Sequence, residues 1–348
     1  MATRKTEIVR SREPRSSLVR SGPVSSSYRG RLAPSPTGLL HVGHARTFWT
    51  ASQRAREAGG TLILRMDDLD PERSRSEYAE AAMEDLRWLG IRWQEGPDKG
   101  GSFGPYAQSR RQAHYAAALN KLIRRGFVYP CRCSRRELAQ TALAPHEGKA
   151  GRGQELGQEL GRELGQDLDE EPIYPGTCRT FDVELAQLPG PTSARLLPEH
   201  VNWRFRVPDG VAVEFVDQNL GPQRFVAGVD FGDFLVWRRD NVASYQLATV
   251  VDDGMMEISE VVRGADLLKS AARQMLLFRA LGYAAPNWYH CELVADHNGQ
   301  RLAKRHDALA LRVLRQRGLT PMNVLSAEVP TVAASDGRAQ TSARLGAG

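Results

Sequence analysis

The hydrophobic pattern near the start of the chain changes from strand-like to helix-like. A short apolar run at 61–66 (TLILRM) is typical of a strand buried in a parallel sheet. Apolar residues then recur at helical spacing from Tyr78 to Leu89, and Gly90 suits the position after a helix end. The pattern therefore predicts a strand followed by an amphipathic helix.

A second helix is predicted beyond position 109. Ser109 and Gln112 resemble a capping box, apolar residues follow at helical spacing from Tyr115 to Leu122, and Gly126 would close the helix. Strands and helices that alternate in this way favour an α/β fold with a parallel sheet.

The remaining pattern predicts a β-rich middle and then a return to α/β. Residues 201–236 contain three strand-like runs (VNWRFRV, VAVEFV and RFVAGV) between Gly, Pro and Asp turns, so we expect a small β-rich insertion. A strand at 256–264 (MEISEVVRG), a helix ending near Gly282 and another helix over 307–317 should follow.

Three segments lack the apolar residues of a packed core. Residues 1–28 are rich in Arg and Ser and are expected to form a disordered basic arm, either an RNA-binding tail or a leader without function. Residues 144–170 repeat GQEL-like units, and a glycine at every fourth position would cost a helix about 1 kcal/mol each, so a low-complexity loop is expected. A disordered tail should close the chain at 326–348.

Composition and charge narrow the class of protein. The 348 residues have a net charge of +6, which fits a polyanionic partner such as RNA, although many basic proteins bind none. No apolar run approaches the ~20 residues of a membrane span, and no signal-type stretch opens the chain, so we expect a cytoplasmic protein without membrane contact. Four cysteines are too few for a disulfide scaffold, and the closely spaced Cys131 and Cys133 suggest a metal site first.

Two motifs could hold phosphate. In 31–46 (RLAPSPTGLLHVGHAR), glycines allow close backbone approach, and His41 and His44 flank an expected helix start, where free N–H groups attract anions. The simpler interpretation is a turn and a helix start. In 299–307 (GQRLAKRHD), Lys304 could lie on a loop that closes on the pyrophosphate of ATP, or the segment could be a solvated basic loop.

Together these motifs resemble the two signatures of class I aminoacyl-tRNA synthetases, and their wording is similar to the glutamyl and glutaminyl branch. The stretches RMDDLDPERS, YQLATVVDD and VVRGADLL resemble the same branch, in order from Tyr28 to Leu311. The resemblance implies a Rossmann-type parallel sheet with an inserted zinc-bearing, tRNA-binding subdomain. It implies an ATP-dependent ligase that forms an aminoacyl-adenylate, with Mg²⁺ accompanying ATP.

Only residues 305–348 follow Lys304, whereas full glutamyl and glutaminyl enzymes continue into a large anticodon-binding region. The chain therefore resembles members of the branch without that region, which attach L-glutamate to the queuosine base in the anticodon stem-loop of tRNA(Asp). We expect a monomer. Two alternatives stay open: a truncated glutamyl- or glutaminyl-tRNA synthetase that charges an acceptor end, and a paralogue that binds tRNA or zinc without catalysis.

The resemblance also implies a structural zinc site and a region that contacts tRNA. The zinc ligands would be Cys131, Cys133, Tyr174 and Cys178, in the order Cys-x-Cys and then Tyr-x-x-x-Cys. Cys291 falls outside this pattern and is expected in the core. The basic cluster expected to help dock tRNA consists of Arg132, Arg135 and Arg136.

Substrate-binding residues carry over by position. The glutamate pocket would consist of Arg31, Leu32, Ala33, Pro34, Ser35, Asp67, Tyr245 and Arg263. Asp67 stands where the family usually has Glu, and glutaminyl enzymes use Asp there, which keeps glutamine open as the substrate.

His41, His44 and Lys304 would stabilise the transition state of adenylate formation. The ATP loop would consist of Arg301, Leu302, Ala303, Lys304 and Arg305. Ala303 replaces the usual Ser or Thr, so we expect weaker ATP handling. Asp68 and Asp70 are expected to cap the helix that follows them.

These expectations divide the chain into a two-part catalytic domain and an insertion. The expected parts are the arm (1–28), the first catalytic half (29–127), the zinc and tRNA subdomain (128–236), the second catalytic half with the ATP loop (237–325) and the tail (326–348).

Overall fold

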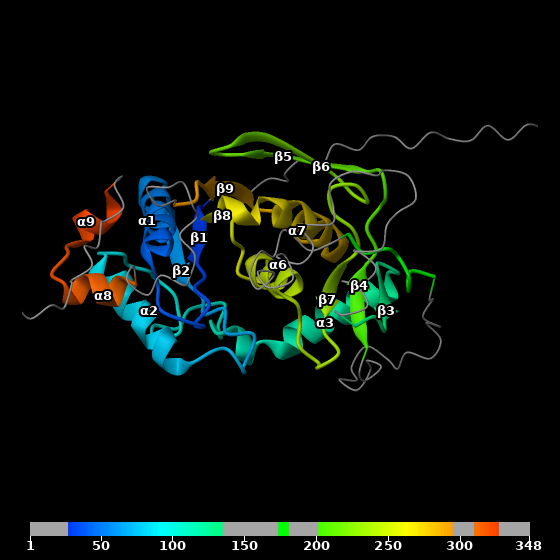
Figure 1. Ribbon diagram of the computed structural model, residues 1–348, viewed down its shortest axis with the longest axis horizontal. Helices are drawn as coiled ribbons and strands as arrows, with labels where there is room; N and C mark the ends of the chain where they lie inside the picture. The colour runs from blue at the N-terminus through cyan, green and yellow to red at the C-terminus, as the bar shows by residue number, and fades with distance from the viewer. Residues whose placement is uncertain (1–26, 135–172, 181–200, 295–309, 327–348) are drawn as a thin grey trace, which may run out of the picture.

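The computed structural model describes residues 27–134, 173–180, 201–294 and 310–326 (Figure 1). Its strands are β1 (Arg29–Leu32), β2 (Thr61–Leu64), β3 (Val128–Cys131), β4 (Asn202–Phe205), β5 (Ala212–Asp217), β6 (Gly221–Val226), β7 (Phe234–Trp237), β8 (Glu260–Gly264) and β9 (Asn287–Cys291). Its helices are α1 (Val42–Glu57), α2 (Ser76–Trp88), α3 (Gln112–Arg124), α6 (Tyr245–Met255), α7 (Leu268–Leu281), α8 (Leu311–Gln316) and α9 (Pro321–Leu325), with short 3-10 turns at Gln108–Arg110 and Ala265–Leu267.

The larger of the two sheets has six strands in the order β2-β1-β8-β9-β5-β6. β1 runs parallel to β2 and β8, and β9 runs parallel to β8 and β5, whereas β6 is antiparallel to β5. The predicted parallel α/β sheet is confirmed, with an antiparallel hairpin at one edge.

Successive side chains along the strands point to opposite faces of the six-stranded sheet and pack into two hydrophobic cores. Leu62 and Leu64 pack with α1, α2 and α8, while Ile63 between them packs with α3, α6 and α7. Val262 and Val261 on β8 divide in the same way. Each such buried side chain contributes roughly 1.5–3 kcal/mol, so both faces of the sheet must be covered.

A second sheet of three antiparallel strands, β3-β4-β7, packs beside α3. Figure 1 places it at one end of the molecule, with α8 and α9 at the other. The β5–β6 hairpin, expected in the β-rich insertion, instead joins the six-stranded sheet through β9. The expected boundary between 236 and 237 falls inside β7, and the division into domains stays a prediction.

Most predicted helices are confirmed. α2 is followed by Gly90 and α7 by Gly282, both with positive φ, where glycine avoids a steric penalty. The helix expected over 307–317 is shorter, because α8 begins at Leu311, and residues 307–309 lie outside the described part of the chain.

The expected capping box at Ser109 is wrong. Ser109 lies in a 3-10 turn, and both its backbone N–H and its hydroxyl donate to Asp68, at 2.9 and 2.7 Å. The expected cap of α2 by Asp68 and Asp70 is also wrong. Asp70 accepts the N–H of Glu72, and α2 begins after Arg75 without a side-chain cap.

Among the described residues, no helix is long and apolar enough to cross a membrane. The predicted arm (except its last two residues), the 144–170 loop and the tail beyond Ser326 lie outside the described residues.

Candidate active site

The loop after β1 leads directly into the start of α1, where two histidines meet. His41 is the N-cap residue: its Nδ1 accepts the N–H of Gly43 at 3.1 Å, and Nδ1 of His44 accepts the N–H of His41 at 3.3 Å. The ring centroids are 3.8 Å apart. Because each Nδ1 is an acceptor, a neutral ring carries its proton on Nε2. The cap thus fixes the tautomer in which each Nε2–H is a donor.

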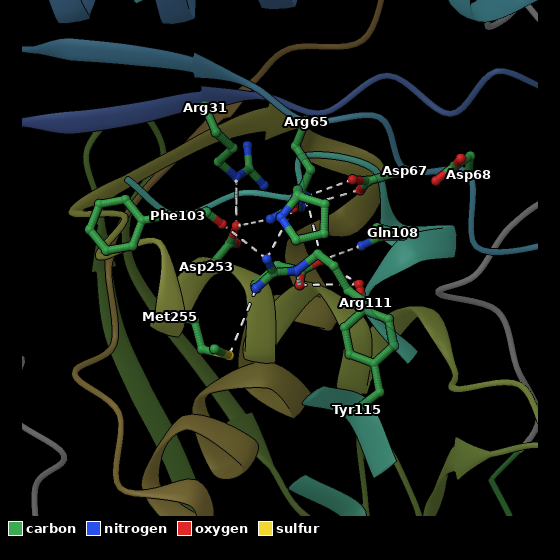
Figure 2. Close-up of polar contacts among 12 residues, drawn as sticks. Arg31, Arg65, Asp67, Asp68, Phe103, Gln108, Arg111, Tyr115, Asp253 and Met255 are labelled. Carbon is green, nitrogen blue, oxygen red and sulfur yellow. Dashed lines mark hydrogen bonds and ion pairs between the residues drawn. The ribbon is translucent and has the colours of Figure 1, made fainter. Parts of the chain in front are cut away.

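A buried charge network lies under the carboxyl ends of β1 and β2 (Figure 2). Arg65 donates from Nε to Asp67 and from Nη1 to Asp253, both at 2.7 Å. Arg31 donates from Nε to Asp253 at 3.3 Å and from Nη1 to the carbonyl of Val262 at 3.2 Å. The predicted pocket residues Arg31 and Asp67 are therefore linked through two residues that sequence reasoning did not single out.

Asp252 is the second centre of the network. It accepts from Nε2 of Gln108 at 2.8 Å, from Nε of Arg111 at 2.6 Å and from the hydroxyl of Tyr115 at 2.9 Å. Nε of Arg65 lies 3.7 Å from it. Because these donors come from the turn before α3 and from α3 itself, Asp252 ties α6 to that region.

The network balances its own charge: its arginines are Arg31, Arg65 and Arg111, and its aspartates are Asp67, Asp252 and Asp253. Burial raises the pKa of Asp67 to about 6, although the ion pair with Arg65 acts in the opposite direction. Buried charges are tolerated only when they are paired and hydrogen-bonded. We infer that this network holds the ends of β1 and β2 on α6.

A sequence signal for the missed residues does exist. Asp252 and Asp253 stand in an apolar helix whose preceding residues, Leu247 to Val251, are all buried. Arg65 follows a buried strand directly. A charged residue at a position that the apolar periodicity predicts to be buried indicates a buried ion pair or hydrogen bond, because a buried charge requires a partner.

The predicted pocket segment 31–35 has mixed exposure. The side chain of Leu32 packs into the core beside α1, Pro34 is buried, Ala33 is half-buried and Ser35 is exposed. The backbone N–H of Asp67 donates to the carbonyl of Pro34 at 3.0 Å. The segment therefore lies against the end of β2 by backbone contact.

The two remaining predicted pocket residues lie on α6 and β8. Tyr245 is the first residue of α6, directly after the N-cap Ser244, and is half-buried. Arg263 is buried, and its guanidinium donates to His290 at 3.1 Å, to Gln274 at 2.8 Å and to a backbone carbonyl at 3.1 Å. Arg31 donates to the backbone carbonyl of the residue before Arg263, so its side chain reaches β8 at that point.

The ATP loop (Arg301, Leu302, Ala303, Lys304 and Arg305) lies outside the described residues, as do Arg135 and Arg136. Arg132 is exposed beside β3, and Cys291 is half-buried against the core that faces α1.

The four predicted zinc ligands meet at the end of β3. The hydroxyl of Tyr174 lies 3.5 Å from the sulfurs of Cys131 and Cys133, and the sulfurs of Cys133 and Cys178 are 3.5 Å apart. The three thiols lie within 4.8 Å of one another. Zn–S bonds of about 2.3 Å in a tetrahedron place sulfurs about 3.8 Å apart, so the donor set fits a tetrahedral zinc ion.

Comparison with known proteins shows which enzymes the chain resembles. The model of the family described as "tRNA synthetases class I (E and Q), catalytic domain" matches residues 27–165 and 193–329. A glutamyl-Q tRNA(Asp) synthetase of Nitratidesulfovibrio vulgaris is 46% identical over 85% of this chain and 83% of its own length. Another of that name, from Symbiobacterium thermophilum, is 45% identical over 85% of this chain and 84% of its own length.

Glutamate–tRNA ligases are more distant relatives. One from Nitrosococcus oceani is 38% identical over 85% of the chain, which spans 57% of that ligase. A crystal structure of a glutamate tRNA ligase from Elizabethkingia meningosepticum, in complex with its amino acid, superposes with a TM-score of 0.63 at 26% identity. That superposition covers 81% of this chain and 53% of the ligase. The chain thus spans little more than half the length of these ligases.

Proposed function

The chain belongs to the class I tRNA synthetases of the E and Q group, and from that premise we propose that it activates L-glutamate with ATP and transfers it to the queuosine base in the anticodon of tRNA(Asp). The observation that carries this proposal is the identity of 46% and 45%, over most of both chains, to two proteins named glutamyl-Q tRNA(Asp) synthetase.

In the first step, an α-carboxylate oxygen of glutamate attacks the α-phosphorus of ATP, and the bond to pyrophosphate breaks. The start of α1 would receive the phosphates, since helix N-termini bind anions. The Nε2–H groups of His41 and His44 would donate to oxygens whose negative charge grows in the transition state, and Lys304 would add a positive charge. Mg²⁺ bound with ATP would neutralise phosphate charge.

The glutamate site would lie between α6 and the ends of β1, β2 and β8. Arg31, Tyr245 and Arg263 would bind the substrate, with the guanidinium groups suited to a carboxylate. Asp67, ionised at neutral pH, would accept a bond from the α-ammonium, because each carboxylate oxygen has a second acceptor site beyond its bond to Arg65. Arg31 is balanced by Asp253, so the permanent positive charge of Arg263 is the feature that favours glutamate over neutral glutamine.

In the second step, a hydroxyl of the queuosine cyclopentene ring would attack the activated carbonyl, and AMP would leave. A zinc ion on Cys131, Cys133, Tyr174 and Cys178 would hold the segment around 173–178 against the end of β3. The exposed Arg132 beside it, with Arg135 and Arg136, would bind phosphates of the anticodon stem-loop.

Transfer of labelled glutamate, and in parallel glutamine, to tRNA from cells with and without queuosine tests the proposal. We expect glutamate to enter only the queuosine-containing tRNA. Equal incorporation into both pools would instead indicate a conventional acceptor-end synthetase, and incorporation of glutamine would reverse the assignment of the amino acid.

The non-catalytic alternative is tested by Lys304→Ala. An enzyme should lose ATP–pyrophosphate exchange in this variant while tRNA binding is largely kept. A wild-type protein that binds tRNA but shows no glutamate-dependent exchange would contradict the proposed activity.

A further inference from the structure

A buried carboxylate and a buried imidazole lie in line behind Arg263. Nε of Arg263 donates to Nε2 of His290 at 3.1 Å, and Nδ1 of His290 lies 2.6 Å from Oδ2 of Asp217. The side chains of His290 and Asp217 are fully buried, and Arg263 is only 5% exposed. Asp217 has no part in the site described above, and His290 was described there only as an acceptor for Arg263.

The direction of these hydrogen bonds fixes the state of the imidazole. A guanidinium nitrogen can only donate, so Nε2 of His290 must be the acceptor, and the ring proton then lies on Nδ1 and is donated to Asp217. Burial and the charge of Arg263 lower the pKa of His290 to about 4, although Asp217 and the backbone carbonyl of Leu267 act in the opposite direction, so the ring is neutral at physiological pH. The hydrogen bonds therefore run from Arg263 through His290 to Asp217.

Asp217 is itself held firmly. Its Oδ1 accepts the backbone N–H groups of Asn219 and Leu220 at 3.0 and 2.9 Å, in the turn between β5 and β6. It also accepts the backbone N–H of His290 at 3.3 Å. The β5–β6 hairpin thus presents one carboxylate oxygen to the turn and the other to the imidazole.

Arg263 is fixed on its other sides as well. Its Nη1 donates to Gln274 at 2.8 Å, and its guanidinium carbon lies 4.8 Å from the centre of the Trp288 ring. With Nε held by His290, these contacts define both the plane and the rotation of the guanidinium. A bidentate contact with a carboxylate depends on that plane.

We propose that Asp217 and His290 are a positioning pair for Arg263, which orient its guanidinium toward the carboxylate of the amino-acid substrate. This inference rests on the proposed glutamate site. It gives the β5–β6 hairpin a role in substrate binding, although no residue of the hairpin need contact the substrate.

Asp217→Asn tests the pair with minimal change of shape. The amide oxygen can still accept from the turn, but the amide nitrogen then faces Nδ1 and forces the ring proton to Nε2, where it opposes Nε–H of Arg263. An imidazole held in the wrong tautomer loses its function even when the geometry is intact. We expect the KM for glutamate in ATP–pyrophosphate exchange to rise roughly 10- to 100-fold, with the KM for ATP within about twofold of wild type.

Asp233→Asn is the matched control. Asp233 is also a buried aspartate: it accepts a loop N–H from Val207 at 2.8 Å and a hydroxyl from Tyr129 at 2.6 Å, and it pairs with Nε of Arg179 at 3.1 Å. It shares the stability cost of a buried Asp→Asn change without touching Arg263. Its KM for glutamate should match that of wild type, and a rise equal to that of Asp217→Asn would overturn the proposal.

Nitrogen NMR of the wild-type histidine rings tests the same inference without any substitution. We expect the signals of His290, assigned by loss in His290→Gln or by through-bond correlation in wild type, to show a neutral Nδ1–H ring between pH 6 and 8. A Nε2–H ring, or an unchanged KM for glutamate in a folded Asp217→Asn protein, would refute the pair. Absence of exchange in wild type would instead refute the proposed function and leave the tautomer measurement to decide the pair.

Discussion

Neutralisation of Asp252 should strongly destabilise the fold, although this residue touches no predicted substrate group. In Asp252→Asn, one carboxylate oxygen becomes an NH₂ group. The three donors that point at Asp252, from Gln108, Arg111 and Tyr115, lie between 2.6 and 2.9 Å from its oxygens. At least one of them would then face another donor.

The expected size of the effect follows from burial. Arg111 and Asp252 are 1% and 0% exposed, and loss of one partner of such a buried pair costs about 3–5 kcal/mol. At about 2–4 °C per kcal/mol for a protein of this size, the melting temperature should fall by about 6–20 °C. A loss of this size is a large part of the ~5–15 kcal/mol that stabilises a typical domain.

Thermal unfolding followed by circular dichroism gives the measurement, and Asp240→Asn gives the control. Asp240 also pairs with an arginine, Arg238, but the two side chains are 47% and 33% exposed, so the pair contributes only about 0–1 kcal/mol. The control should melt within about 4 °C of wild type. If Asp252→Asn melts no lower than the control, the buried charge network does not stabilise the fold.

Three further predictions concern the site. Because the pKa of Asp67 is about 6 and its charged form should bind the ammonium, the KM for glutamate should rise toward tenfold per pH unit below pH 6; a KM constant from pH 7 to 5 would exclude that role. His44→Ala should lower kcat of exchange about 100- to 1,000-fold, and a change below twofold would remove His44 from catalysis. In Cys178→Ala, metal analysis should show loss of bound zinc, and transfer of glutamate to tRNA should be lost. ATP–pyrophosphate exchange should persist, because the cysteine cluster lies at the three-stranded sheet and not among the residues proposed to bind ATP and glutamate. A full zinc content would contradict the ligand set.

Periodicity predicted the parts of the fold whose stabilising contacts are local. The run at 61–66 became β2, and the helices before Gly90 and Gly282 end where the pattern placed their ends. The spacing of apolar residues determines which face of an element is buried, and a glycine with positive φ allows the chain to leave a helix. Both features can be recognised within a few residues of sequence.

Distant partners explain what the pattern missed. Ser109 resembled a helix cap, but Asp68, far away in sequence, takes both of its donors. The β5–β6 hairpin joins the main sheet through the pairing of Asp217 with Trp288, which no local rule specifies. Asp68 was predicted to cap α2 because the groups next to it in sequence suit a cap, whereas its partner Ser109 lies in another element.

In the candidate site, too, some residues were predicted from the sequence and others were not. The resemblance brought together Cys131, Cys133, Tyr174 and Cys178 before any geometry was known, and the structure places them in one cluster. The residues that hold the predicted pocket in place were not predicted, because their roles depend on partners in other elements. Buried charges in apolar segments were the available signal.

Removal of the 3′-terminal adenosine from queuosine-containing tRNA(Asp) tests most directly to which atom of the tRNA glutamate is attached. The proposed transfer to the anticodon predicts that intact and shortened tRNA accept labelled glutamate equally, with the label in the anticodon fragment after nuclease digestion. Loss of acceptance on shortening would instead show that the chain charges the acceptor end.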